Sequence, residues 1–243
     1  MKAIIFDVGR TLMEYKNMPN VWTEFYQSSF EYVRSELALN ISDADIERSI
    51  DILRSYNPKI NYREIDYSPE MIFGKATEHW NADFPLDDVI DSFYSSLNLT
   101  SYIYEETIPV LKKLKLEGYI IAVLTDVATG MPDELHKSYF EELLPYFDMY
   151  VSSISCGYRK PNPKGLNDIA EHFGISPDEM IYIGDEEKDI HAAKRFGCKS
   201  VLIDRSKTGM YFGQDFTVSN LNELFDVLKK ENKNERLFRK RTQ

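Results

Sequence analysis

Cysteine is scarce in this sequence of 243 residues, where only Cys156 and Cys198 occur. Two thiols cannot build the dense disulfide framework of small secreted domains. Long apolar runs are also missing. None approaches the roughly 18 residues that a membrane-spanning helix needs, and the apolar run near the N-terminus is too short for a signal peptide. We therefore expect a soluble protein of the reducing cytoplasm, without a membrane partner.

Basic residues are fewer than acidic ones: the chain has 29 lysines and arginines and 40 aspartates and glutamates, which gives a net charge of −11. Such a charge repels a phosphate backbone and argues against nucleic acid as a general partner. The end of the chain is the exception, since residues 229–243 carry seven basic and two acidic side chains. We interpret residues 231–243 as a solvated basic tail, with a tether to an acidic surface as the alternative.

Short apolar runs are what the sequence does contain, within an overall hydrophobic content of 43%. They are rich in β-branched and aromatic residues without strict alternation, which is typical of strands covered on both faces. Segments with helical spacing separate them, and several end on glycine. This alternation predicts an α/β fold, a Rossmann-like parallel sheet with helices on both faces. The expected strands are residues 2–8, 119–127, 147–155, 180–185 and 200–204, and the expected helices are 105–118, 162–174, 188–197 and 219–231.

A region of different character follows the first expected strand. Between residues 17 and 97 the apolar positions recur every three or four residues, and no strand-like run is present. This pattern predicts an inserted, all-helical domain. We expect a core domain of residues 1–15 and 98–230, a helical domain of residues 16–97, and the basic tail.

Polar side chains follow the expected strands at the points where they end. In an open parallel sheet ligands bind beyond the carboxyl ends of the strands, so these residues are candidates for a site. Singly, each has a structural explanation, such as a helix cap, a loop-stabilising aspartate or a surface lysine. Together they offer acids, a hydroxyl and an ammonium group at one edge. The set is Asp7, Thr125, Asp126, Lys160, Asp185 and Asp189.

Four segments resemble the ordered motifs of the haloacid dehalogenase superfamily, most of whose members are phosphatases. The segments are "FDVGRTL" (6–12), "VLTD" (123–126), "GYRKPNP" (157–163) and "YIGDEEKDIHAAKRFG" (182–197). The insertion after the first segment resembles the C1-type helical cap of that superfamily. The resemblance implies a Mg²⁺-dependent hydrolase acting on a small phosphorylated metabolite.

The resemblance also implies roles for individual residues. Asp7 would attack phosphorus and form an aspartyl phosphate, with Lys160 and the Thr125 hydroxyl stabilising the transferred group. The implied metal ligands are Asp7, the main-chain carbonyl of Gly9, Asp185 and Asp189, where Asp189 would hold either Lys160 or a metal-bound water. The expected substrate contacts are Thr125, Asp126 and Lys160, together with Arg10, whose guanidinium pairs well with phosphate oxygens.

Two positions depart from the pattern of the superfamily. Most of its phosphatases carry a second aspartate, the general acid and base, where this chain has Gly9, and a glycine where it has Arg10. Three functions stay open: a phosphatase that is slow or assisted by another group, a non-catalytic module that binds a phosphorylated ligand or a partner, and a 2-haloacid dehalogenase. The acid cluster disfavours the dehalogenase, because it would repel an anionic haloacid unless a metal neutralised it. Arg10 would reach a phosphate or a cap acid, or face solvent.

Substrate choice would depend on the insertion and on the turn before it. Tyr15, Lys16 and Asn17 follow the first strand closely enough to be candidates for contacting the leaving group. Both a monomer and a homodimer remain open.

Overall fold

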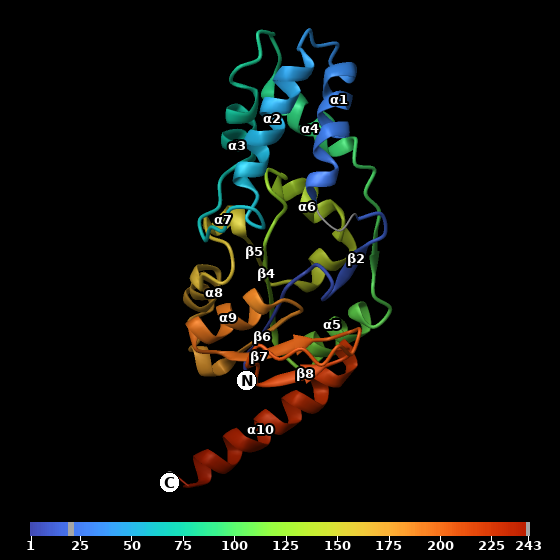
Figure 1. Ribbon diagram of the computed structural model, residues 1–243. Coiled ribbons are helices and arrows are strands. Elements are labelled where there is room, and N and C mark those ends of the chain that lie inside the picture. The colour runs from blue at the N-terminus through green and yellow to red at the C-terminus, as the bar shows by residue number, and fades with distance from the viewer. Residues whose placement is uncertain (19–21, 242–243) are drawn as a thin grey trace.

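A parallel sheet of six strands lies at the centre of the described part of the chain (Figure 1). The computed structural model describes the backbone of residues 1–18 and 22–241, and the side chains of these residues up to 233. The strand order is β5-β4-β1-β6-β7-β8, and every neighbouring pair is parallel. The strands are β1 (Ala3–Phe6), β4 (Ile120–Thr125), β5 (Met149–Ser152), β6 (Met180–Gly184), β7 (Lys199–Ile203) and β8 (Phe216–Val218). The predicted α/β fold is confirmed, and five of the six strands fall within or next to predicted ranges.

Helices cover both faces of this sheet. Successive residues of each strand point to opposite sides, so each strand has apolar side chains that pack on both faces. On one face Ile4 and Phe6 pack with Val110 and Leu114, and on the other Ile5 packs in a second cluster against the neighbouring helices. This two-sided burial explains why the strands lack an alternating pattern. The helices of the α/β part are α5 (Thr107–Leu116), α6 (Asp133–Ser138), α7 (Ser153–Cys156), α8 (Lys164–Phe173), α9 (Glu187–Phe196) and α10 (Leu224–Arg241).

The segment between β2 and β3 is helical, as its spacing predicts, and lies at the opposite end of the molecule from α10 (Figure 1). Its aromatic residues form a cluster of their own, in which Phe30, Phe73 and Phe93 are fully buried. Val127 and Met131, from the loop after β4, complete that cluster and anchor the insertion on the α/β part. The helices of the insertion are α1 (Tyr26–Glu36), α2 (Asp43–Tyr56), α3 (Pro69–Thr77) and α4 (Leu86–Ser95), preceded by a 3₁₀ turn at Trp22–Glu24.

Two predicted elements are wrong in extent. The strand expected over residues 147–155 ends at Ser152, because the Ser152 side chain accepts a hydrogen bond from the Ser155 amide (2.9 Å) and caps the short helix α7. The helix expected over residues 219–231 begins at Leu224. A 3₁₀ turn capped by Asn220 precedes it, and the Ser219 hydroxyl donates to the Glu223 side chain (2.6 Å) instead of capping the helix.

A two-stranded antiparallel sheet joins the two ends of the insertion. Its strands are β2 (Met13–Tyr15) and β3 (Ser101–Ile103), neither of which the sequence predicts. This pairing brings the chain into and out of the insertion at the same place, beside the carboxyl end of β1. The two connections therefore lie together next to the candidate residues.

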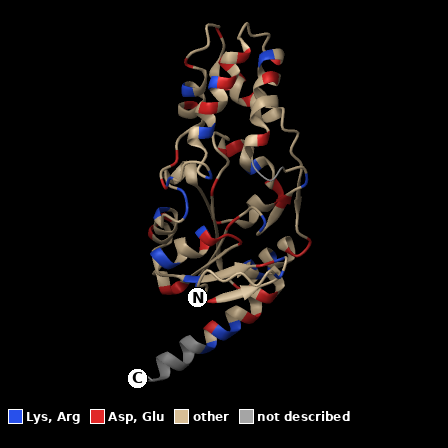
Figure 2. Ribbon diagram, viewed as in Figure 1, with Lys and Arg blue, Asp and Glu red and all other residues tan. Residues whose placement is uncertain are grey.

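Charged residues of both signs occur along most of the described chain. Figure 2 shows acidic and basic residues interspersed on both the insertion and the α/β part. Among the described residues, no helix is long and apolar enough to cross a membrane. Most side chains of the predicted basic tail, residues 231–243, lie outside the described part of the structure.

Candidate functional site

The polar residues predicted from the strand ends meet at one edge of the sheet. Asp7 follows β1, Thr125 ends β4 and Asp185 follows β6, and β1 pairs with both of the other two strands. The Asp7 amide continues the ladder by donating to the carbonyl of Ile183 (2.8 Å). The backbone therefore fixes where the carboxylate of Asp7 emerges. Asp7 and Thr125 are buried, with 7% and 2% of their surfaces exposed.

Lys160 bridges two aspartates at this edge. Its Nζ lies 2.6 Å from Asp7 Oδ1 and 2.7 Å from Asp189 Oδ1, and both Lys160 and Asp189 are buried. Burial alone would lower the pKa of the Lys160 ammonium, but Asp189 and Asp7 raise this pKa well above its ordinary value. The ammonium is therefore charged at every physiological pH and is held against Asp7.

Asp189 has little capacity left for another ligand. Besides Lys160, Oδ1 accepts from the Tyr182 hydroxyl (3.2 Å), and Oδ2 accepts from the Glu186 amide (2.9 Å). A β-carbon at Gly184 would lie 2.3 Å from the Asp189 carboxyl carbon, so only glycine permits this approach. The arrangement supports the interpretation of Asp189 as the residue that orients Lys160.

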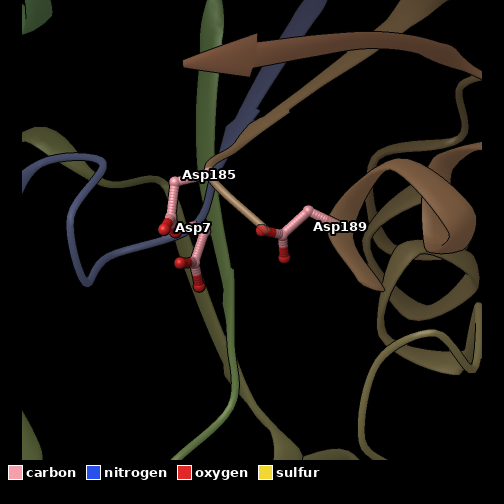
Figure 3. A group of neighbouring side chains, drawn as sticks. All are labelled: Asp7, Asp185 and Asp189. Carbon is pink, nitrogen blue, oxygen red and sulfur yellow. The ribbon is translucent and has the colours of Figure 1, made fainter. Parts of the chain in front are cut away.

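Three carboxylates lie close together at this edge of the sheet (Figure 3), and Lys160 contacts two of them. Asp7, Asp185 and Asp189 each offer an oxygen, and these oxygens lie within 4.8 Å of one another. Burial and the charges of Asp189 and Asp7 raise the pKa of Asp185 to about 8, and burial raises that of Asp7 to about 6 despite Lys160. These shifts reflect negative charge that the neighbouring cations do not fully offset. Such an all-oxygen donor set suits a hard divalent cation.

Arg10 and Asp126, both predicted to contact substrate, have protein partners here. Arg10 Nη2 lies 2.7 Å from Asp185 Oδ2 and 2.8 Å from Glu186 Oε1, although 54% of the side chain is exposed. Asp126 accepts from the Lys160 amide (3.0 Å) and pairs with Lys188 (3.0 Å). Its carboxylate is buried, yet the nearby cations, Lys188 first, hold the pKa of Asp126 below its ordinary value.

Two adjoining cavities open onto these residues. The inner cavity, of about 420 Å³, is lined by Asp7, Gly9 and Thr125 and by side chains of the insertion. The outer cavity, of about 870 Å³, shares Arg10, Asp185 and several other residues with it. Of the residues expected to select substrate, Tyr15 lines the inner cavity, whereas neither cavity is lined by Lys16 or Asn17. The insertion contributes Trp22, Asn57, Pro58 and Lys59 to the inner cavity.

His136 is a wall residue of the inner cavity that the sequence does not single out. Its Nδ1 lies 2.9 Å from the Tyr150 hydroxyl. Burial, together with the charges of Lys160 and Lys137, lowers the pKa of His136 to about 4. The imidazole is therefore neutral near pH 7 and is a poor proton donor there.

A buried ion pair ties the insertion to the loop that carries Lys160. Asp66 Oδ2 lies 2.7 Å from Arg159 Nη1, and Asp66 Oδ1 lies 2.7 Å from Arg63 Nη1. The backbones also join, since the Asp66 amide donates to Gly157 (2.9 Å) and the Arg159 amide donates to Glu64 (2.9 Å). The sequence motif contains Arg159, but nothing in the spacing indicates that its partner lies in the insertion.

We expect Asp66→Asn to lower the free energy of unfolding by about 3 kcal/mol, because two largely buried guanidinium groups would lose their shared carboxylate. Urea denaturation measures the loss. Asp51→Asn is the matched control, since Asp51 is exposed and faces Arg54 at 3.6 Å. Its expected effect is below about 0.5 kcal/mol. Equal losses in the two variants would contradict a structural role for the buried pair.

Comparison with known proteins shows a relationship along most of the chain. A model of haloacid dehalogenase-like hydrolases matches residues 1–197. A glyceraldehyde 3-phosphate phosphatase of Pyrococcus furiosus is 24% identical, and the match covers 96% of this chain and 95% of that protein. Another protein of that name, from Methanopyrus kandleri, is 31% identical over 94% of this chain and 97% of its own length. Among solved structures, a HAD phosphatase from Thermococcus onnurineus has a TM-score of 0.61 at 22% identity, covering 94% of this chain and 98% of that one.

Proposed function

This chain belongs to the haloacid dehalogenase-like hydrolases, and we propose that it is a Mg²⁺-dependent phosphatase that acts on a small phosphate ester. The observation that carries the proposal is the buried contact of 2.6 Å between Asp7 and Lys160, beside the carboxylate of Asp185 and open to the inner cavity. This contact supports the roles of Asp7 as nucleophile, Lys160 as a fixed positive charge and Asp185 as a metal ligand. The relatives named as phosphatases support the same activity.

Asp7, Asp185 and the carbonyl oxygen of Gly9 would hold the metal ion. The donor set is all oxygen, and within the described residues no hydrogen bond reaches the Gly9 carbonyl. Asp189 positions Lys160 and is not a metal ligand in this proposal, because its two carboxylate oxygens already accept hydrogen bonds. When bound, Mg²⁺ supplies positive charge that offsets the charge of the phosphoryl group and favours the ionised form of Asp7.

Asp7 acts as the nucleophile. One of its carboxylate oxygens attacks phosphorus, the bond from phosphorus to the ester oxygen breaks, and an aspartyl phosphate forms. Lys160 and the Thr125 hydroxyl stabilise the negative charge on the transferring oxygens. Water then attacks the aspartyl phosphate and releases inorganic phosphate, which regenerates the carboxylate.

Proton transfer is the incomplete part of this site. None of three nearby residues is suited to donate a proton near pH 7. Gly9 has no side chain, and His136 is already neutral. Arg10 keeps its proton, because Asp185 and Glu186 raise its pKa further above the ordinary value despite burial. The proton for the departing oxygen therefore comes from water. An ester whose leaving group needs little protonation, such as an aryl phosphate, is the best substrate for such a site.

The helical insertion serves as the cap. Residues 16–97 would form this second domain on a core of residues 1–15 and 98–230. Trp22, Asn57 and Lys59 bring the insertion to the inner cavity, where the leaving group of a small phosphorylated metabolite would lie. Closure around the ester excludes water and strengthens the electrostatic contacts of the site.

A second candidate is a non-catalytic module that binds a phosphorylated ligand in this cavity. The specific observation in its favour is Gly9, which leaves the site without the usual proton-transfer group. The dehalogenase alternative is weaker, because the three converging carboxylates would repel a haloacid anion in the absence of a metal.

Metal removal tests the proposal. With p-nitrophenyl phosphate as substrate, we expect Mg²⁺ to support phosphate release and excess EDTA to reduce it by at least about 100-fold, since the metal stabilises transition-state charge. Excess Mg²⁺ should restore it. Glyceraldehyde 3-phosphate is the first natural ester to assay. Binding of inorganic phosphate without any turnover would favour the binding module, and metal-independent chloride release from 2-chloropropionate would favour the dehalogenase.

A further inference from the structure

Arg10 occupies a backbone position that suits glycine. Its φ is +54°, in the left-handed region that costs an ordinary residue about 1 kcal/mol. The loop is fixed around it, because the Arg10 amide donates to Met13 (2.7 Å) and Arg205 donates to the carbonyls of Arg10 (3.1 Å) and Thr11 (2.7 Å). An arginine is thus retained in a strained conformation at the edge of the site.

The guanidinium group contacts one of the converging carboxylates. Arg10 Nη2 lies 2.7 Å from Asp185 Oδ2, and only 11% of the Asp185 side chain is exposed. Lys160 instead pairs with Asp7 and Asp189. Among the described residues, Arg10 is therefore the cation paired with Asp185. A metal ion and this guanidinium would therefore compete for the same carboxyl group.

Glu186 offers Arg10 a second partner outside the carboxylate group. The same Nη2 lies 2.8 Å from Glu186 Oε1. Arg10 can thus give up Asp185 while it keeps one charge-assisted hydrogen bond. Its exposure of 54% leaves it free to turn toward the two cavities that it lines.

We propose that Arg10 is an internal competitor of the metal ion: its guanidinium occupies the Asp185 carboxyl in the metal-free protein, and a divalent cation displaces it toward Glu186 and the cavity in order to bind. The proposal rests on the metal site of the proposed function and does not require turnover. It follows that Arg10 weakens metal binding. In exchange, the displaced guanidinium lies where an anionic substrate enters.

Calorimetric titration of the substrate-free protein with MgCl₂ or MnCl₂ tests this directly. We expect Arg10→Gln and Arg10→Gly each to lower the metal Kd about five- to tenfold, the scale of a lost partly exposed charge-assisted pair. The two variants separate charge from backbone strain, because glutamine removes the charge and keeps the strain of a side chain at this φ, while glycine removes both the charge and the strain. Circular dichroism and thermal melting confirm that each variant folds.

Arg34→Gln is the matched control, since it removes the same charge from the insertion, where Arg34 pairs with Asp43 (2.6 Å). It should leave the metal Kd within about twofold of the wild type, because Arg34 pairs with Asp43 in the insertion and contacts none of the three converging carboxylates. Equal tightening in this control, or tightening by Arg10→Gly alone, overturns the proposal. If the wild type binds metal and Arg10→Gln binds it no more tightly, only this inference fails. If no variant binds metal, the metal site of the proposed function fails as well.

Discussion

Replacement of Asp7 by asparagine is expected to reduce phosphate release by at least about 10³-fold, because an amide oxygen is a poor nucleophile and cannot form the aspartyl phosphate. The change keeps the shape of the side chain and leaves Lys160 paired with Asp189 (2.7 Å). The fold should therefore persist. Phosphate release from p-nitrophenyl phosphate at saturating Mg²⁺ measures the effect, and a thermal melt of the same sample establishes that the variant is folded.

Asp215→Asn is the matched control for this experiment. Asp215 precedes β8, at the amino ends of the strands and thus at the opposite edge of the sheet from Asp7, where it accepts from the Ser200 amide (3.0 Å) and pairs with Lys199 (2.9 Å). We expect a loss of stability and a turnover number close to that of the wild type. Activity of Asp7→Asn above about one-tenth of the wild-type value would mean that another group attacks phosphorus, or that the reaction does not pass through an enzyme-bound phosphate.

The centre of the fold could be predicted because it depends on local patterns. The runs around β1, β4 and β6 are buried on both faces, so their apolar character is continuous and visible in the sequence. Helices that end on glycine were equally clear: Gly118 and Gly197, which follow α5 and α9, both have the positive φ that glycine permits. Parallel pairing then brings the strand-terminal residues to one edge without further information.

The short strands could not be predicted, because their stability comes from distant partners. β2 and β3 have three residues each and are separated in the sequence by the whole insertion. Three residues are too few to show a period of two, and nothing local indicates that they pair. β8 was missed for the same reason, since it adds to β7 at the outer edge of the sheet.

The sequence predicts which residues lie together at the candidate site, but it does not predict the partners of the long charged side chains. A backbone position determines where an aspartate at a strand end points, as Asp7 shows. The guanidinium of Arg10 or Arg159 can reach in many directions, and its partner is chosen by the folded surroundings. The contacts of Arg10 with Asp185 and of Arg159 with Asp66 therefore appear only in three dimensions. Neither contact leaves a periodic trace in the sequence.

Gly9→Asp is expected to raise kcat about 10- to 100-fold on an alkyl phosphate. A well-placed general acid contributes about 10²- to 10⁴-fold, and a newly introduced carboxyl should recover part of that. The position can accept the change, since an added β-carbon at Gly9 meets no atom within 4 Å and the glycine does not have a positive φ. Gly9 also lines the inner cavity with Asp7, so we expect the new carboxyl to be within reach of the leaving group in that cavity.

The choice of substrate and control isolates proton transfer in this experiment. An aryl phosphate needs little protonation, so the gain should be much smaller with p-nitrophenyl phosphate than with an alkyl ester such as glyceraldehyde 3-phosphate. Gly9→Asn fills the same space without an ionisable group and should give no gain on either substrate. If Gly9→Asp and Gly9→Asn behave alike, then filling the cavity or changing the loop explains the result. If neither variant changes kcat while Asp7→Asn abolishes it, proton transfer does not limit turnover in the wild type. Another group or a water then already supplies the proton at a sufficient rate.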